Sequence, residues 1–127
     1  MPRAVEPRPL SQEERVLAEF LLSAEFPGRD ELKSKLESAE VVGVCECGCG
    51  TVDLAIKGLA VRAVCREPIP VEAYRSALDV MLFVRDGLLC SIEIVDYEDK
   101  RPLSYPRPDD LKLWVAPLGQ PRARPSR

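Results

Sequence analysis

The segment LDVMLFVRDGLLCSIEIV, residues 78–95, decides the fold that we expect. Two apolar runs flank Asp86-Gly87, and Asp-Gly between such runs is the strongest short-range signal of a β-hairpin. With these two residues as the loop, Glu93 lies opposite Val80. Both faces of the hairpin are then largely apolar, which predicts a position in the middle of a sheet.

Further strand signals lie upstream of this hairpin. The period-two alternation of Val41–Cys45 and of Thr51–Ile56 predicts a second hairpin. Its turn is residues 47–50, whose glycines permit the positive φ that tight connections need. Leu59–Cys65 alternates as well and is a further candidate strand. The sequence therefore predicts an antiparallel sheet of four to five strands.

Two helices are expected before the first of these strands. Ser11 and Glu14 have the spacing of a capping box, and apolar residues recur behind them at helical spacing, so we expect a helix at residues 12–24. A Pro-Gly pair ends it, and a shorter amphipathic helix follows at residues 29–38. We predict an α+β fold in which two N-terminal helices pack on the antiparallel sheet and a proline-rich C-terminal tail follows.

The chain has 127 residues, enough for one compact domain and too few for two ordinary ones. We expect a flexible N-terminus at residues 1–9 and a single α+β domain at residues 10–99. Residues 100–118 should form an extended proline-rich segment that docks on the body through apolar side chains around Trp114. Residues 119–127 should form a disordered basic tail.

The charge is unevenly distributed along the chain. Residues 1–99 carry 19 acidic and 11 basic side chains, whereas residues 100–127 carry two acidic and seven basic ones. An acidic body repels phosphate, so we expect no nucleic-acid partner for the folded body. We also expect no membrane span, because no apolar run is long enough. The absence of a secretory signal, together with an odd number of cysteines, predicts a cytoplasmic protein with reduced thiols.

The one compact group of chemically active side chains is Cys45-Glu46-Cys47-Gly48-Cys49. Three or four thiolates within reach of one another would bind zinc or a softer ion such as Cu(I), with Cys65 as the candidate fourth ligand. The alternative is that these cysteines are small buried apolar residues in a glycine-rich turn. The spacing favours this alternative, because structural zinc sites usually place two residues between paired cysteines.

A nucleophilic cysteine is a second interpretation of the same group. It needs a cationic or histidine neighbour to lower its pKa, and Glu46 and Asp53 would do the opposite. The chain has no histidine, which excludes histidine-based triads and HExxH metalloproteases. Disulfide exchange stays open as an alternative that no neighbouring residue supports.

Carboxylates on the central hairpin are candidates for acid/base catalysis. Asp79 and Glu93 lie on it, and the predicted register places Glu93 among apolar side chains, where carboxylates with catalytic roles are often found. The alternative is a partly open face, or an ion pair with an arginine such as Arg62 or Arg85.

Four segments together resemble a family of small bacterial proteins. They are FLLSAEFPG at residues 20–28, CECGC at residues 45–49, LFVRDG at residues 82–87 and IEI at residues 92–94. The resemblance covers about residues 10–97 and does not extend to the basic tail. The family has no established function, so the resemblance implies no activity and no catalytic residue.

Three functions follow as hypotheses. The first is a non-enzymatic protein-binding module that uses its acidic helices or the sheet face not covered by them. The second is a zinc-binding protein with Cys45, Cys47, Cys49 and Cys65 as ligands. The third is a small enzyme that uses carboxylate acid/base chemistry. The apolar hairpin also suggests a homodimer, unless the tail covers it.

Overall fold

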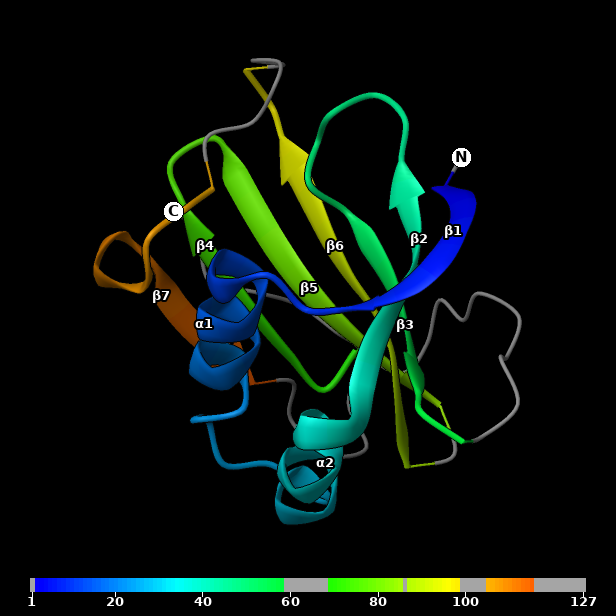
Figure 1. The fold of residues 1–127 in the computed structure, drawn as a ribbon. Coiled ribbons are helices and arrows are strands. Elements are labelled where there is room, and N and C mark those ends of the chain that lie inside the picture. The colour runs from blue at the N-terminus through cyan, green and yellow to red at the C-terminus, as the bar shows by residue number, and fades with distance from the viewer. Residues whose placement is uncertain (1, 59–68, 86, 99–104, 116–127) are drawn as a thin grey trace.

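The computed structural model describes residues 2–58, 69–85, 87–98 and 105–115. Figure 1 shows them as one twisted sheet with helices packed on one side. In chain order, the elements are β1 (Pro2–Pro9), α1 (Gln12–Leu21), α2 (Arg29–Lys35), the 3-10 helix η1 (Leu36–Ser38), β2 (Ala39–Cys45), β3 (Val52–Ile56), β4 (Val71–Arg75), β5 (Leu78–Arg85), β6 (Leu88–Asp96), the 3-10 helix η2 (Pro108–Asp110) and β7 (Lys112–Val115).

The strands of the described residues form one seven-stranded antiparallel sheet in the order β1-β2-β3-β6-β5-β4-β7. The α+β architecture with an antiparallel sheet is confirmed, but the predicted count of four to five strands is wrong. The additional strands are β1, β4 and β7. The candidate strand Leu59–Cys65 lies outside the described residues.

The additional strands were not expected because proline lies within or close to each of these segments and argues against pairing in a sheet. β1 occupies the segment expected to be a flexible N-terminus and contains Pro2, Pro7 and Pro9, which have no N–H to donate. It is an edge strand paired only with β2, and an edge tolerates missing donors. β7 is the opposite edge, and β4 follows directly after Pro70. Tertiary context, and not local composition, makes these segments strands.

A β-bulge corrects the predicted register of the central hairpin. Glu93 pairs with Met81 and not with Val80, because Cys90 is an extra residue in β6 between the pairs Phe83–Ser91 and Val84–Leu89. The shift by one residue moves Glu93 to the sheet face opposite the helices. It also brings the isoleucines of β6 onto the helix-covered face, where they are buried.

The capping box predicted at the first helix is confirmed. The Glu14 backbone N–H donates to Ser11 Oγ at 3.2 Å, and the Ser11 N–H donates to Glu14 Oε1 at 2.7 Å. The same carboxylate accepts two hydrogen bonds from Arg8 of β1, at 2.8 and 2.9 Å. Burial alone would raise the pKa of Glu14, but the hydrogen bonds from Arg8 and Ser11 outweigh it and lower the pKa. This carboxylate therefore connects the first strand to the first helix.

The main core lies between the helices and one sheet face. Its fully buried members include Leu17, Leu21 and Leu22, which pack against alternate residues of the central strands. Each fully buried leucine contributes about 2 kcal/mol to stability. Among the described residues, no helix is long and apolar enough to cross a lipid bilayer.

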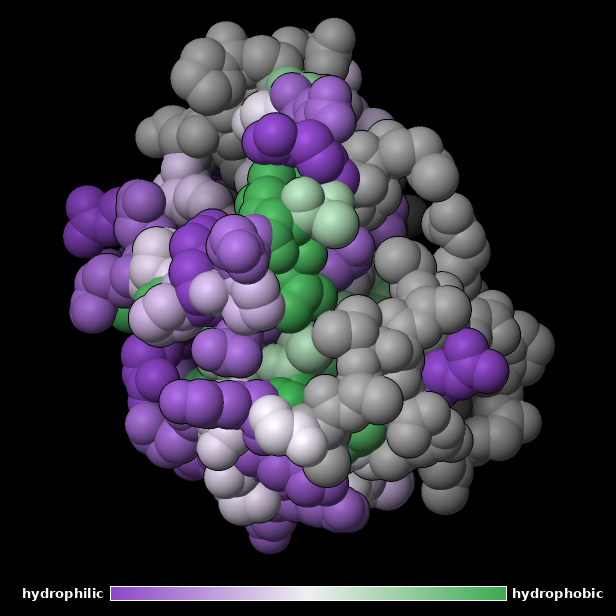
Figure 2. All heavy atoms as spheres, turned by 45° about the vertical axis from the view of Figure 1, so that its right-hand side comes forward, coloured by the Kyte–Doolittle hydropathy of each residue, from purple (hydrophilic) through white to green (hydrophobic). Residues whose placement is uncertain are grey.

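The sheet face opposite the helices, here the second sheet face, carries a smaller apolar cluster and buried polar side chains. Phe83 and Cys90 form a small apolar cluster there with Ile69 and Met81. Buried polar side chains, among them Glu72 of β4, share this face. Figure 2, turned by 45° from the view of Figure 1, shows the molecule from another side, where a narrow strip of apolar side chains lies between polar ones.

Candidate metal centre

The cysteine group lies in the loop that joins β2 to β3. Cys45 ends β2, and its N–H donates to Thr51 O at 3.1 Å, so the loop closes where the two strands separate. Inside it, the Gly48 N–H donates to Cys45 O at 3.4 Å. Gly48 and Gly50 have φ of 82° and 90°, which only glycine adopts at little cost. These two residues curl the backbone, and the side chains of alternate residues converge on one side.

The sulfur atoms of Cys45, Cys47 and Cys49 all lie within 4.8 Å of one another. The Sγ atoms of Cys45 and Cys47 are 3.0 Å apart. An ion that holds three thiolates tetrahedrally at about 2.3 Å needs sulfur–sulfur separations of about 3.8 Å. One pair is 3.0 Å apart and no pair is more than 4.8 Å apart, so shifts of up to about an ångström would bring the three sulfur atoms to this separation.

The three thiols differ in burial. Cys49 is buried, Cys45 is half-buried and Cys47 is exposed. The alternative interpretation, in which these cysteines only fill space, therefore fits Cys49 but not Cys47. The fourth predicted ligand, Cys65, lies outside the described residues. Cys90 belongs to the apolar cluster on the second sheet face and is not part of this group.

Two residues that the sequence analysis did not single out hold the loop in place. Thr51 Oγ1 accepts a hydrogen bond from the Ile94 N–H at 2.9 Å and donates to Ile94 O at 3.3 Å, and it also accepts one from Cys49 Sγ at 3.3 Å. The Tyr105 hydroxyl donates to Gly50 O at 2.9 Å. The position of Thr51 directly after the glycine turn is the one sequence signal that could have identified it.

The electrostatics of the loop favour a bound cation. The pKa of Cys45 is raised to about 11, mainly because its hydrogen bond with Cys47 Sγ favours the protonated form, and burial and Cys49 add to this. Sulfur atoms packed this closely resist carrying several negative charges, and a metal ion that replaces their protons removes that repulsion. The nearby ion pair of Arg3 with Glu46, at 3.7 Å, is exposed to solvent.

The carboxylates predicted for catalysis lie on the second sheet face. Asp79 is buried and accepts a hydrogen bond from the Tyr97 hydroxyl at 2.7 Å. Glu93 is half-buried. Glu72, which the sequence analysis missed, is 1% exposed. Both residues pair with Met81, so the two carboxylates lie on either side of it on the same sheet face. Within the described ranges, the cysteines are the only group of three or more potential metal ligands in close contact. The enzyme hypothesis stays a prediction.

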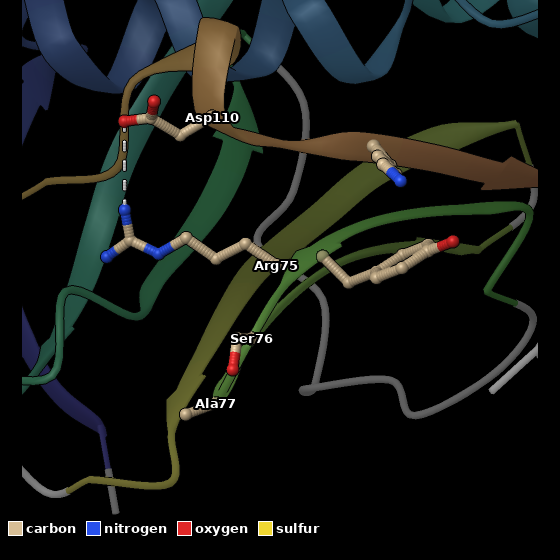
Figure 3. Close-up of a pocket in the computed structure, with 6 residues that line it drawn as sticks. Arg75, Ser76, Ala77 and Asp110 are labelled. Carbon is tan, nitrogen blue, oxygen red and sulfur yellow. Dashed lines mark ion pairs between the residues drawn. The ribbon is translucent and has the colours of Figure 1, made fainter. Parts of the chain in front are cut away.

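A pocket of about 390 Å³ lies at the turn between β4 and β5 (Figure 3). Arg75 reaches across it toward Asp110, with Nη1 and Oδ2 3.9 Å apart. Ser76 and Ala77 form the turn at its side, and its lining includes neither Asp79 nor Glu93. This pocket does not provide the predicted carboxylate site.

The acidic helical surface is partly neutralised by its own neighbours. Arg15 pairs with Glu19 and Glu37, and Lys35 pairs with Glu31 at 3.0 Å. Exposed pairs of this kind contribute little to stability, but they lower the net charge that a basic partner would meet. Recognition of a protein partner by this surface stays a prediction.

No protein-family model, no curated protein and no solved structure matches this chain. Among the described residues, the cysteine group is the feature whose geometry indicates a chemical role.

Proposed function

We propose that the protein binds a thiophilic metal ion, with zinc as the first candidate, through the thiolates of Cys45, Cys47 and Cys49. The observation that carries this proposal is the convergence of the three sulfur atoms to within 4.8 Å in one short loop. Thiolates select zinc and Cu(I) over hard cations such as Mg²⁺ and Ca²⁺. The chemistry of the ligands and their separations support the same class of ion.

The position of the ligands favours reversible binding over a structural role. Structural zinc sites are usually closed by four ligands. Here three ligands come from five consecutive residues, and the core between helices and sheet is built without them. The exposed thiol of Cys47 leaves the site open to solvent and to an exchanging ligand. We therefore expect metal removal to leave the fold largely intact.

Metal content and affinity test this proposal together. The full chain, purified under reducing conditions without chelator, should contain about one zinc ion per chain and should compete with a chromophoric chelator for added Zn²⁺. Cys47→Ser should lose this competition, because it removes a ligand from the most exposed position. Cys90→Ser is the matched control and should bind as the wild type does, since Cys90 lies in a separate cluster.

Two further measurements identify the fourth ligand and the preferred ion. Cys65→Ser weakens binding if Cys65 supplies the fourth ligand, and it leaves binding unchanged if an external ligand does. Replacing zinc by Cu(I) in the same competition identifies which ion the loop prefers. Wild-type protein that binds neither ion more tightly than Cys47→Ser would overturn the proposal.

A further inference from the structure

Within the cysteine group, Cys45 and Cys47 are in direct contact through their sulfur atoms. Their sulfur atoms are 3.0 Å apart, about 1 Å more than a disulfide bond requires. The two residues are separated only by Glu46, and the turn at Gly48 brings their side chains to the same side. We propose that Cys45 and Cys47 form a reversible disulfide and that the metal-free loop is a centre for thiol–disulfide exchange. This activity goes beyond metal binding and does not depend on it.

The surroundings assign a separate role to each thiol. Cys47 is exposed, so an incoming disulfide can reach it. Cys45 is half-buried at the end of β2, where its N–H is bonded to Thr51 O, and it lies directly beside Cys47. Cys49 is buried, and its Sγ donates to Thr51. Solvent access beside a second, resolving thiol is typical of redox-active cysteines. A cationic neighbour would speed the exchange by raising the thiolate fraction, but the equilibrium between dithiol and disulfide does not require one. Cys47 is therefore the attacking thiol, Cys45 resolves the intermediate, and Cys49 takes no part.

The reaction balances with a low-molecular-weight disulfide as oxidant, for which oxidised glutathione is the probe. The Cys47 thiolate attacks one sulfur of glutathione disulfide, whose S–S bond breaks and releases one glutathione thiolate. The Cys45 thiolate then attacks Cys47 Sγ and expels the second glutathione thiolate. Two electrons pass from the protein to the glutathione disulfide. The protons that Cys45 and Cys47 lose are taken up by the two released thiolates.

Such a bond would be easily reduced. A disulfide between residues two apart closes a small ring, and deviation from ideal disulfide geometry stores strain that makes the bond more reducible. The loop gains no long-range cross-link from it, because the two cysteines are almost adjacent in sequence. The oxidised form should therefore exchange with thiols and return to the dithiol.

Thiol counting in glutathione buffers tests this inference. The chelator-treated full chain is equilibrated at a series of reduced-to-oxidised glutathione ratios, alkylated, digested and mapped by mass spectrometry. The wild type should lose two alkylation sites, at Cys45 and Cys47, and should regain both when reduced glutathione is added. Cys45→Ser should stop at a mixed disulfide on Cys47. Cys47→Ser should form no internal disulfide in the loop.

Two further variants separate this inference from the proposed function. Cys49→Ser should weaken metal binding but still form the Cys45–Cys47 bond, and Cys90→Ser should behave as the wild type in both assays. Circular dichroism of each variant shows that it is folded. A disulfide that involves Cys49, Cys65 or Cys90 would overturn the inference, whatever the metal result. So would a series in which no ratio of reduced to oxidised glutathione removes two alkylation sites.

Discussion

Replacing Thr51 by valine should destabilise the protein, because the Thr51 hydroxyl serves two backbone groups of β6. It accepts from the Ile94 N–H at 2.9 Å and donates to Ile94 O at 3.3 Å, and Thr51 itself is 8% exposed. The residue pairs between β3 and β6 are Val52–Ile92 and Asp53–Ser91. Beyond them, the Thr51 hydroxyl takes the place of the backbone groups that would otherwise continue the hydrogen bonds between the two strands.

Valine has nearly the same shape as threonine but leaves both groups of Ile94 without this partner. Each buried group that loses its hydrogen bond costs about 1–3 kcal/mol, and the added buried methyl returns about 0.8 kcal/mol. Two such losses less the gain from the methyl group come to about 1–5 kcal/mol, so we expect the free energy of unfolding to fall by about 3 kcal/mol. With a urea m-value of about 2 kcal/mol/M, the midpoint should fall by about 1–2 M.

Urea denaturation followed by circular dichroism measures this change, with Thr51→Ser as the matched control. Serine keeps the hydroxyl and loses one methyl group, so its cost should stay near 1 kcal/mol. If Thr51→Val is as stable as Thr51→Ser, to within about 0.5 kcal/mol, the Thr51 hydroxyl does not anchor the cysteine loop and the reasoning is refuted.

Three other changes test separate parts of the structure. Ala77→Gly should raise the free energy of unfolding by about 0.5–1 kcal/mol in the same assay, because Ala77 has a φ of 62°, and an unchanged or lower stability would contradict this. Gly43→Ala should lower it by about 1–3 kcal/mol, because the new Cβ would lie 3.3 Å from both Arg3 O and Asp53 Cβ and 2.9 Å from Asp53 Oδ2, and an unchanged stability would contradict this. Glu14→Gln should lower it by about 1–3 kcal/mol at neutral pH through the loss of the hydrogen bonds from Arg8. The folded-state pKa of Glu14 is lowered, so this stability is fully present above the unfolded value of 4.5 and is lost as the pH falls through the folded-state pKa. Urea titrations at several pH values should show the difference between the wild type and Glu14→Gln shrink on acidification, and a constant difference would refute the assignment.

The parts of the fold with local signals were predictable from the sequence. The capping box of Ser11 and Glu14 depends on residues three apart, and it starts the first helix where expected. The Asp-Gly turn likewise identified the strands now seen as β5 and β6. Near that turn the structure pairs Val84 with Leu89, as a two-residue Asp-Gly loop predicts.

The register beyond that turn was not predictable. The bulge at Cys90 adds one residue to β6, and nothing in the composition of the hairpin marks it. A second irregularity lies in β2, where the pairing passes from Val41 to Gly43. The first of these reverses the face on which Glu93 lies.

For the cysteine group, too, local sequence identified the residues but not their arrangement in space. The sequence identified Cys45, Cys47 and Cys49 as candidate ligands from their residue type and closeness. Their convergence depends on the curled backbone of the loop and on its attachment by Thr51 and Tyr105, which come from pairing with other parts of the fold. The single residue between consecutive cysteines argued against a metal site, but the loop still brings the three sulfur atoms within 4.8 Å of one another.

X-ray absorption spectroscopy at the zinc edge tests the metal proposal most directly, because it counts the atoms bound to the ion. The reduced full chain loaded with one equivalent of Zn²⁺ should show at least three sulfur neighbours at about 2.3 Å, and Cys47→Ser should show fewer. A coordination shell made of oxygen and nitrogen at about 2.0–2.1 Å, with no more than one sulfur, would show that Cys45, Cys47 and Cys49 do not hold the ion together.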